Sequence, residues 1–144
     1  MDKRVSSRGV IIEDNNLITL FRRKLKNNKI MEYYSLPGGG LEENESIEES
    51  VIRELKEELS VDVIVRGYVG KRETDTAVEY YFDCSIVEGT PILGGEEKEQ
   101  NNPNNYYEVR KLPLSEIYNV DLLGQNLIIK ALNKEYISLD EKIV

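Results

Sequence analysis

Residues 38–61 read GGGLEENESIEESVIRELKEELSV, and this stretch decides the fold. A glycine-rich turn leads directly into a segment with strong helix signals. Ser46 and Glu49 form a capping box, in which the serine accepts from a backbone N–H and the glutamate reaches back to the N-cap. Apolar side chains then recur every four residues and give one buried stripe. The stretch predicts a helix over residues 46–59, with an apolar face formed by Ile47, Val51, Leu55 and Leu59.

Three glutamates stand close together on this helix. Glu54, Glu57 and Glu58 occupy positions i, i+3 and i+4, so their carboxylates span about 100° of the helix surface. Adjacent carboxylates repel one another. Hard cations such as Mg²⁺ or Mn²⁺, which prefer carboxylate oxygens, would offset that repulsion. The pattern fits either a divalent metal site or a solvated acidic helix face, and these three residues alone leave both interpretations open.

The spacing of the whole stretch resembles the Nudix box, G-x5-E-x7-R-E-U-x-E-E-x-G-U, in which U is a bulky aliphatic residue. The one departure is Ser60, which stands where the box has its last glycine. That glycine resembles a helix C-terminal residue, where a positive φ is often wanted, so we expect the serine to cost some stability or to end the helix differently. Asn44 stands where relatives often carry glycine, and asparagine tolerates the left-handed region. The matching positions are Gly39, Glu45, Arg53, Glu54, Leu55, Glu57, Glu58 and Val61.

The resemblance implies an activity and a role for each matching residue. Nudix enzymes hydrolyse a nucleoside diphosphate linked to another moiety, by attack of water at phosphorus with divalent ions bound. Mg²⁺ or Mn²⁺ is therefore the expected cofactor. Glu57 and Glu58 would be metal ligands together with the backbone carbonyl of Gly38, and Glu54 would be a further ligand or would orient the water. A structural role in the box falls to Gly39, Glu45 and Arg53.

The general base has two candidates. The chain contains no histidine, so a glutamate must accept the proton of the attacking water. Glu54 is the first candidate. In several relatives a downstream loop glutamate joins the metals or acts as base, and Glu97, which follows Gly94 and Gly95 at a short distance, is the second. The alternative interpretation of Glu97 is a solvated acid on a loop.

Basic and aromatic residues near the box are candidates for substrate contacts. The resemblance suggests that Arg8, Arg22 and Arg23 bind the substrate, with surface solubility as the alternative for each. Because neighbouring strand residues point to opposite faces, at most one of Arg22 and Arg23 reaches the ligand directly. Tyr80 and Tyr81 fit a strand with one ring in the core and one exposed. Rings that could stack on a nucleobase, or simply pack, belong to Tyr33, Tyr34, Tyr106 and Tyr107.

Strand patterns lie on both sides of the helix. A polar stretch follows the second of them over residues 24–29, and a C-terminal helix is expected from Leu122 to Leu132. The order β-β-β-α-β-β-β-α is typical of a mixed sheet with helices packed on it. We expect an α/β (α+β) fold of the Nudix type, a mixed β-sheet sandwiched between helices, in a single domain over residues 1–144. The expected strands cover residues 4–12, 16–24, a short segment before Gly38, 62–72, 76–87 and 106–112.

Composition narrows the function further. The absence of histidine excludes Ser-His-Asp triads and histidine metal sites. The single cysteine, Cys84, excludes an intrachain disulfide and is expected as a core thiol, so a reducing cytoplasm is the simplest compartment. No apolar run approaches the roughly 18–20 residues of a membrane helix, and the N-terminus carries no secretory signal pattern. The net charge is 19 − 27 = −8, with the bases gathered in residues 3–29 and the acids in residues 42–58.

These features define the expected function and its alternatives. The small size favours a nucleoside triphosphate pyrophosphohydrolase of the MutT-like kind, which releases the monophosphate and pyrophosphate. The alternatives are hydrolysis of ADP-ribose, another sugar nucleotide or a diadenosine polyphosphate, and a nucleotide-sensing Nudix domain without turnover. The expected partner is a small-molecule nucleotide, with no membrane and no DNA or RNA duplex, and the protein is expected to be a monomer or homodimer.

Overall fold

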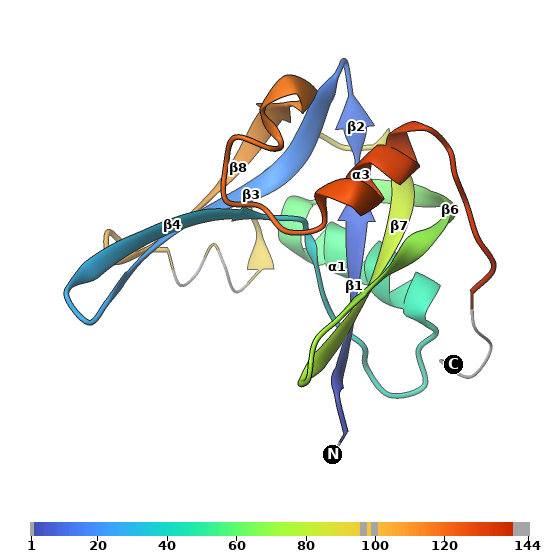
Figure 1. Ribbon diagram of the computed structural model, residues 1–144, viewed down its shortest axis with the longest axis horizontal. Helices are drawn as coiled ribbons and strands as arrows, with labels where there is room; N and C mark the ends of the chain where they lie inside the picture. Colours follow the sequence, from blue (N-terminus) through green and yellow to red (C-terminus); the bar gives the residue numbers. More distant parts are fainter. Residues whose placement is uncertain (1, 96–97, 99–100, 140–144) are drawn as a thin grey trace.

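A computed structural model describes residues 2–95, 98 and 101–139 of the chain. The strands are β1 (Arg4–Val10), β2 (Ile12–Glu13), β3 (Asn16–Lys26), β4 (Lys29–Ser35), β5 (Gly38–Gly40), β6 (Asp62–Glu73), β7 (Ala77–Glu88) and β8 (Asn105–Pro113). The helices are α1 (Ile47–Leu59), the 3-10 turn η1 (Leu114–Glu116) and α3 (Gln125–Leu132). Figure 1 shows the sheets and helices packed into one body, from which the hairpin of strands β3 and β4 projects.

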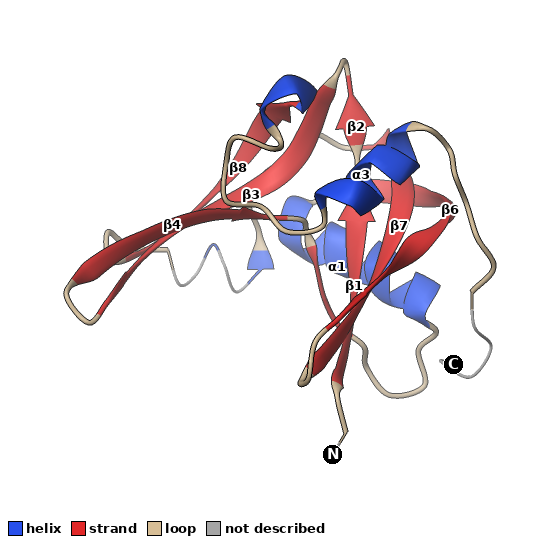
Figure 2. Cartoon of the chain, viewed as in Figure 1, coloured by secondary structure: helices blue, strands red, loops and turns tan. Residues whose placement is uncertain are grey.

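The first sheet is mixed and has the strand order β5-β1-β7-β6. Figure 2 shows its strands β1, β7 and β6 beside helices α1 and α3. Strands β1 and β7 run parallel, from the pair Arg4 and Ala77 to the pair Val10 and Asp83. The outer pairs, β1 with β5 and β6 with β7, are antiparallel. Strand β5 consists of three glycines and forms one edge of this sheet, so that edge carries no side chains.

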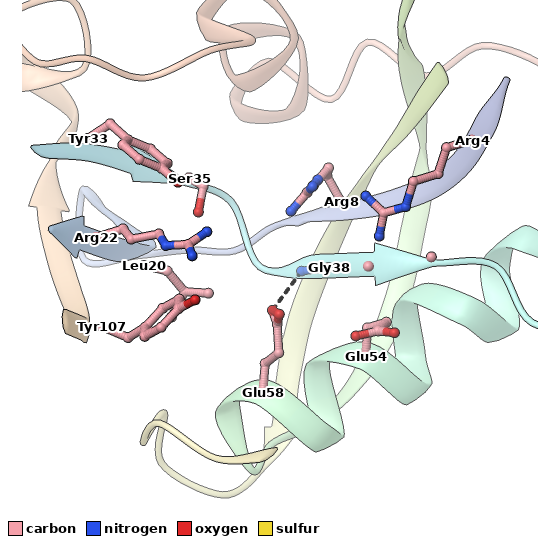
Figure 3. A pocket seen from close by; sticks show the side chains of 12 residues that line it. Arg4, Arg8, Leu20, Arg22, Tyr33, Ser35, Gly38, Glu54, Glu58 and Tyr107 are labelled. Carbon is pink, nitrogen blue, oxygen red and sulfur yellow. Dashed lines mark hydrogen bonds between the residues drawn. The ribbon is translucent and has the colours of Figure 1, made fainter. Parts of the chain in front are cut away.

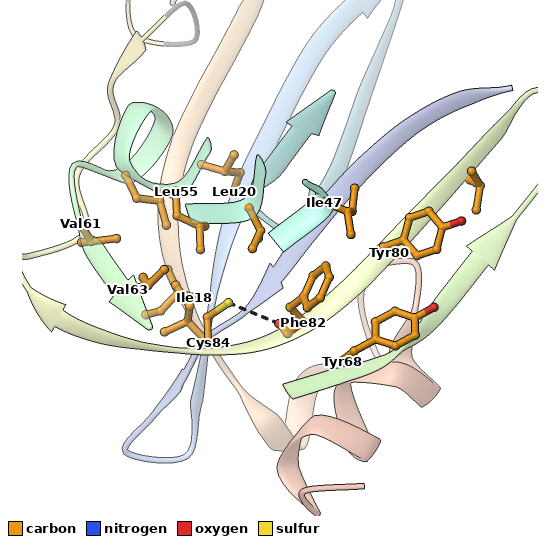
Figure 4. Packing of buried hydrophobic residues seen from close by; sticks show 14 residues of the cluster. Ile18, Leu20, Ile47, Leu55, Val61, Val63, Tyr68, Tyr80, Phe82 and Cys84 are labelled. Carbon is orange, nitrogen blue, oxygen red and sulfur yellow. Dashed lines mark hydrogen bonds between the residues drawn. The ribbon is translucent and has the colours of Figure 1, made fainter. Parts of the chain in front are cut away.

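Helices cover both faces of the mixed sheet, as the sequence predicts. The even-numbered residues of β7, such as Phe82, face the apolar stripe of α1 (Figure 4). The odd-numbered Tyr81 faces Ile128 and Ala131 of α3 on the other side. Burial on both faces explains why Tyr80 and Tyr81 are both in the core, so the expectation that one of these rings is exposed is wrong.

The second sheet is antiparallel and centres on β3. Strand β8 pairs along one edge of β3, while β2 and β4 pair along the other. Strands β3 and β4 form one long hairpin, so the polar stretch over residues 24–29 is a strand-turn-strand segment. The turn residues Asn27 and Asn28 both have positive φ, at 52° and 62°, which suits a two-residue hairpin turn. The sequence signal for this turn is the asparagine pair, because the flanking residues lack an apolar alternation.

Both ends of α1 agree with the sequence. Ser46 accepts from the Glu49 N–H, and the Glu49 side chain accepts from the Ser46 N–H, so the predicted capping box is present. Ser60 at the C-cap has φ 60° and ψ 34°, which is the left-handed conformation expected of the missing glycine. Asn44 also has a positive φ, 63°. The helix therefore ends as it would with glycine, and the serine bears the backbone strain.

The segment after α3 folds back over the α3 face of the mixed sheet. Asp83 of β7 is only 3% exposed. It accepts hydrogen bonds from Lys134 Nζ at 3.0 Å and from the Tyr136 hydroxyl at 2.6 Å. The ring of Tyr136 lies on Gly67, where a Cβ atom would collide with it, and the Ile137 N–H donates to the Tyr68 carbonyl. Burial and the hydrogen bond to Asp83 raise the pKa of Tyr136 to about 12.

Cys84 is buried, and desolvation raises the pKa of its thiol, as expected of a core residue. Among the described residues, no helix is long and apolar enough to cross a membrane.

Candidate active site

A cavity of about 380 Å³ lies between the glycine strand β5, helix α1 and the second sheet (Figure 3). Ligand pockets commonly measure about 300–1,000 Å³, so this one would hold a small ligand or part of a larger one. Its lining combines cationic, anionic and aromatic side chains with exposed glycine backbone. The lining residues are Arg4, Arg8, Leu20, Arg22, Tyr33, Ser35, Gly38, Gly39, Gly40, Glu54, Glu58 and Tyr107.

The glycine edge brings opposite charges into one cavity. On β1, Ser7 faces α1, because its hydroxyl meets the Ser50 hydroxyl of that helix at 3.0 Å. Since strand side chains alternate, Arg4 and Arg8 lie on the other face of the sheet. Figure 3 shows these arginines on one side of β5 and the glutamates of α1 on the other. Both sets reach the same cavity because no side chain of β5 separates them.

Glu58 is buried at the inner end of the cavity. It is 6% exposed, and its Oε1 accepts a hydrogen bond from the backbone N–H of Gly38 at 2.9 Å. Gly38 has φ 152°, and a Cβ atom there would collide with the Ser7 carbonyl, so the position requires glycine. In a strand the N–H and C=O of one residue point to the same side. The Gly38 carbonyl, the proposed metal ligand, therefore also faces away from β1.

Glu54 lines the cavity one turn before Glu58. Its carboxylate lies directly against Gly39, where an added Cβ atom would be 2.5 Å from Glu54 Oε2. Arg53 Nη1 donates to Glu54 Oε1 at 2.9 Å. The glycine at position 39 thus leaves room for this carboxylate beside the backbone, which gives the structural role of Gly39 a physical cause.

Arg53 connects the acidic groups around the box. Its guanidinium donates to both oxygens of Glu45, at 2.6 and 3.0 Å, and to the Gly40 carbonyl at 3.0 Å. It also reaches Glu57 Oε2 at 3.2 Å. The hydrogen bonds from Arg53 lower the pKa of Glu45, and Glu45 in turn raises the pKa of Arg53. The predicted pairing of Arg53 with Glu45 is present and ties the loop, the glycine strand and α1 together.

The donor atoms in the cavity fit a hard divalent cation. Glu54 and Glu58 present carboxylate oxygens beside the backbone of Gly38 and Gly39. Glu57 is not among the residues that line the cavity; 55% of its side chain is exposed, and its Oε2 accepts from Arg53 Nη1 at 3.2 Å. Within residues 2–95, 98 and 101–139, no group of three metal-binding side chains is preassembled. Mg²⁺ is typically held by one or two carboxylates together with substrate phosphates and water, so a complete protein cage is not required.

The structure separates the three candidate arginines. Arg8 lines the cavity and is fixed by Glu79 Oε2 at 3.1 Å and the Leu36 carbonyl at 3.0 Å. Arg22 also lines it. Arg23 instead pairs with Glu32 at 3.1 Å and does not line the cavity. The expectation that only one of two adjacent arginines reaches the site agrees with this geometry, whereas a direct contact from Arg23 does not.

Arg22 is held in the cavity by its neighbours. Its Cζ lies 4.6 Å from the centre of the Tyr107 ring, and Nη2 is 3.4 Å from Asn105 Oδ1. Its Nε is buried and, among the described atoms, has no hydrogen-bond partner. A buried donor without an acceptor costs free energy, so this guanidinium is suited to an anion.

The remaining candidate residues differ in where they lie. Glu97 lies outside the described residues. Tyr33 and Tyr107, two of the four candidate stacking rings, line the cavity. Sequence reasoning missed Arg4, although its separation of four residues from Arg8 on one strand places both on the same face.

A second hollow of about 200 Å³ adjoins the first and shares Arg8, Tyr33 and Ser35 with it.

Comparison with known sequences agrees with this architecture. The model of the NUDIX domain matches residues 3–126. The chain is 33% identical over 105 residues to the ADP-ribose pyrophosphatase of Methanocaldococcus jannaschii, covering 72% of this chain and 61% of that protein. It is 40% identical over 55 residues to the 8-oxo-dGTP diphosphatase of Proteus vulgaris, covering 38% of this chain and 48% of that protein. The chain thus spans about half to three-fifths of these curated relatives.

Solved structures share the fold. A NUDIX hydrolase from Nitrosomonas europaea superposes with a TM-score of 0.69 at 16% identity, covering 99% of this chain and 96% of that one. The MutT protein of Methanosarcina mazei superposes with a TM-score of 0.63 at 19% identity, covering 94% and 98%. The matched sequence contains both the glycine edge and the carboxylate helix that build the cavity. On these grounds the chain belongs to the Nudix family.

Proposed function

We propose that the protein is a divalent-metal-dependent pyrophosphohydrolase that cleaves a phosphoanhydride bond of a nucleoside diphosphate derivative, with nucleoside triphosphates as its preferred substrates. The observation that carries the proposal is the meeting of Glu54 and Glu58 with Arg8 and Arg22 in one cavity over the glycine edge. Carboxylates suit a divalent cation and guanidinium groups suit phosphate. A nucleotide phosphate chain needs both.

The cavity residues would bind and orient the phosphate chain. Arg8 and Arg22 would donate hydrogen bonds to phosphate oxygens, each from a guanidinium that its neighbours already hold in place. Glu58, Glu54 and the Gly38 carbonyl would hold the divalent cation, and the exposed side chain of Glu57, on the same helix one residue before Glu58, would be a further ligand. A bound cation supplies charge neutralisation at the phosphates and lowers the pKa of a bound water. Positioning and electrostatics carry most phosphoryl-transfer catalysis.

The reaction requires one proton acceptor. Water forms a bond to phosphorus, the anhydride P–O bond breaks, and a triphosphate yields the monophosphate, pyrophosphate and one proton. We assign the Glu54 carboxylate as the group that accepts this proton, because it lines the cavity beside Glu58 and no histidine is present. Arg53, which donates to Glu54 at 2.9 Å, holds the carboxylate in position.

The second hollow is suited to the part of the substrate that is not phosphate. It adjoins the main cavity at Arg8 and is lined by apolar and aromatic groups such as Leu123 and Tyr81, together with the carboxylates of Glu79 and Asp121. An apolar wall with a few polar groups is the usual character of a small-molecule site. A nucleoside can therefore extend from the phosphates at Arg8 into this hollow.

A second candidate substrate is ADP-ribose. It is favoured by the relative that shares 33% identity over 72% of this chain and carries the name ADP-ribose pyrophosphatase. A nucleotide-sensing domain without turnover is the third candidate, and the retention of Glu54, Glu57 and Glu58 weighs against it.

Direct assay separates these candidates. The purified protein is incubated with Mg²⁺ or Mn²⁺ and nucleoside triphosphates, oxidised dGTP, ADP-ribose, other sugar nucleotides or diadenosine polyphosphates, and the products are separated by chromatography. Cleavage of triphosphates to monophosphate and pyrophosphate, lost without metal and lost in Glu57→Gln, supports the proposal. Cleavage of ADP-ribose alone selects the second candidate. A rise in melting temperature with a nucleotide, without any product, selects the third.

A further inference from the structure

We infer that Arg4 binds a phosphate beyond the diphosphate that is cleaved, and that the protein therefore prefers ligands with three or more consecutive phosphates. This inference rests on the proposed function, because it assumes that the cavity receives a phosphate chain. It assigns a specificity role to a residue outside the Nudix box.

Arg4 is placed differently from the other cavity arginines. Strands β1 and β5 pair so that Arg8 lies opposite Gly38 and Ser6 lies opposite Gly40. Arg8 is therefore at the Gly38 end of the glycine edge. Arg4 is at the Gly40 end, where a Cβ atom on Gly40 would be 3.4 Å from Arg4 Nη2. The cavity therefore has one arginine side chain at each end of the glycine edge.

Among the described residues, the side chain of Arg4 has no hydrogen-bond or ion-pair partner, in contrast to its neighbours. Lys3 pairs with Glu73 at 2.7 Å, and Arg8 pairs with Glu79 at 3.1 Å. The Arg4 backbone is fixed, since its N–H donates to the Thr76 carbonyl at 2.9 Å. Its guanidinium, however, makes no hydrogen bond or ion pair with the described part of the chain, although it lines the cavity. A cation held by its backbone and open at its head group is suited to an incoming anion.

Arg4 is the cavity arginine that a bound diphosphate would leave without an anion. Three arginines line it against two glutamates, in a protein whose net charge is −8. A bound divalent cation would add further positive charge. Arg8 and Arg22, together with the cation at Glu54 and Glu58, account for a diphosphate. A third phosphate extending along the glycine edge would meet Arg4, whereas a diphosphate linked to a neutral sugar has no anionic group for it.

The test compares Arg4→Gln with the matched control Lys3→Gln, which removes an adjacent positive charge that faces Glu73 instead. Binding of inorganic tripolyphosphate and of pyrophosphate is measured by calorimetry in the presence of Mg²⁺. We expect Arg4→Gln to weaken tripolyphosphate about tenfold and pyrophosphate less than about twofold, since one charged hydrogen bond is lost. Lys3→Gln is expected to change neither affinity, and Arg4→Lys is expected to recover part of the loss.

Steady-state kinetics give a second readout. Arg4→Gln is expected to raise the KM for a nucleoside triphosphate about tenfold and to leave the KM for ADP-ribose within about twofold. Equal losses for both ligand classes, or no loss for either, would overturn the assignment. Binding of tripolyphosphate is measured without turnover. Selective weakening there, in a protein that hydrolyses no nucleotide, would uphold Arg4 while refuting the proposed function.

Discussion

The backbone N–H of Gly38 donates a hydrogen bond to Glu58 Oε1 at 2.9 Å, between residues twenty positions apart in the chain. This bond joins the glycine edge of the mixed sheet to the last turn of α1. It also fixes the orientation of a carboxylate that is 6% exposed. The site is thus held by an interaction that a backbone group makes with a charged side chain, which is among the stronger kinds of hydrogen bond.

Replacement of Glu58 by glutamine tests its proposed role at the metal. The amide oxygen of glutamine can still accept from Gly38, so we expect the fold to persist while the affinity for a divalent cation falls. Metal-dependent hydrolysis is expected to decrease at least about a hundredfold. Titration of activity with Mg²⁺ measures this change, and removal of metal by a chelator should reproduce it in the parent protein. Glu48→Gln, an exposed position on the same helix, serves as the control; an equal loss there would contradict the assignment.

Arg22 and Arg23 provide a matched pair of adjacent arginines. Arg22 lines the cavity with a buried Nε, while Arg23 pairs with Glu32 outside it. We expect Arg22→Gln to raise the KM for the nucleotide about tenfold or more, because a charge-assisted bond to phosphate is lost. Arg23→Gln is expected to change the KM by less than about twofold, since exposed ion pairs contribute little. If Arg23→Gln has the larger effect, the placement of the ligand is wrong.

Gly39→Ala tests the close approach of the glycine edge to Glu54. The new methyl group would lie 2.5 Å from the Glu54 carboxylate, so the carboxylate must move. A displacement of a catalytic group by about 1 Å can lower kcat/KM about a hundredfold. Gly40→Ala meets only the flexible end of Arg4, at 3.4 Å, and is expected to cost less. Kinetics and thermal unfolding are measured together, and a large loss of stability with little loss of activity in Gly39→Ala would contradict this view.

Glu45 makes the stability of the loop dependent on pH. Arg53 lowers the pKa of Glu45 below 4.5, so the ion pair stabilises the folded protein above that pH and is lost as the pH falls through the lowered pKa. We expect Glu45→Gln to reduce the free energy of unfolding by about 1–2 kcal/mol at pH 7. The difference from the parent should shrink below pH 4.5. Urea unfolding at several pH values measures it, and a difference that grows on acidification would have the wrong sign.

Ser60→Gly is expected to stabilise the protein. A left-handed conformation costs an ordinary residue about 1–2 kcal/mol, and glycine loses about 0.5–1 kcal/mol more backbone entropy on folding. The net gain is about 0.5–1 kcal/mol, which corresponds to roughly 1–4 °C in melting temperature. Asn44→Gly, also at a positive φ, should gain less because asparagine tolerates this region. Differential scanning calorimetry measures the melting temperatures of the parent and of both variants. An unchanged or lower melting temperature in Ser60→Gly would show that the serine side chain has a compensating contact.

The sequence predicts the helix, its caps and the box pairing because these depend on local spacing. Ser46, Glu49 and Ser60 act within a few residues of their partners, and Arg53 reaches Glu45 across one loop. The long hairpin is less predictable, since its turn at Asn27 and Asn28 lies in a polar stretch without apolar alternation. Recognition of such a hairpin depends on pairing with another strand, which no local pattern contains.

The remaining differences between the sequence-based expectations and the structure depend on contacts between elements that are far apart in the chain. Tyr81 is buried because α3 covers the second face of the sheet, and periodicity within β7 cannot reveal a helix more than forty residues later. Arg4 and Arg22 meet in one cavity only because β5 lacks side chains and β3 lies across from it. The roles proposed for the site residues stay predictions, whereas their placement follows from the fold.

Lys134 and Tyr136, which both donate hydrogen bonds to Asp83, limit how far the chain can be shortened from its C-terminal side without loss of the fold. The NUDIX domain match ends at residue 126, yet the partners of this buried carboxylate lie eight and ten residues further on. A fragment cut at the end of the match would lose both hydrogen bonds to Asp83, the ring that lies on Gly67, and most of α3 with its core residues Ile128 and Ala131. Ile128 and Ala131 are fully buried, so the burial of apolar surface would be lost together with these hydrogen bonds. The cooperative unit therefore extends beyond the boundary that family similarity alone would suggest, because β7 needs both the apolar cover of α3 and the hydrogen bonds from the segment after it.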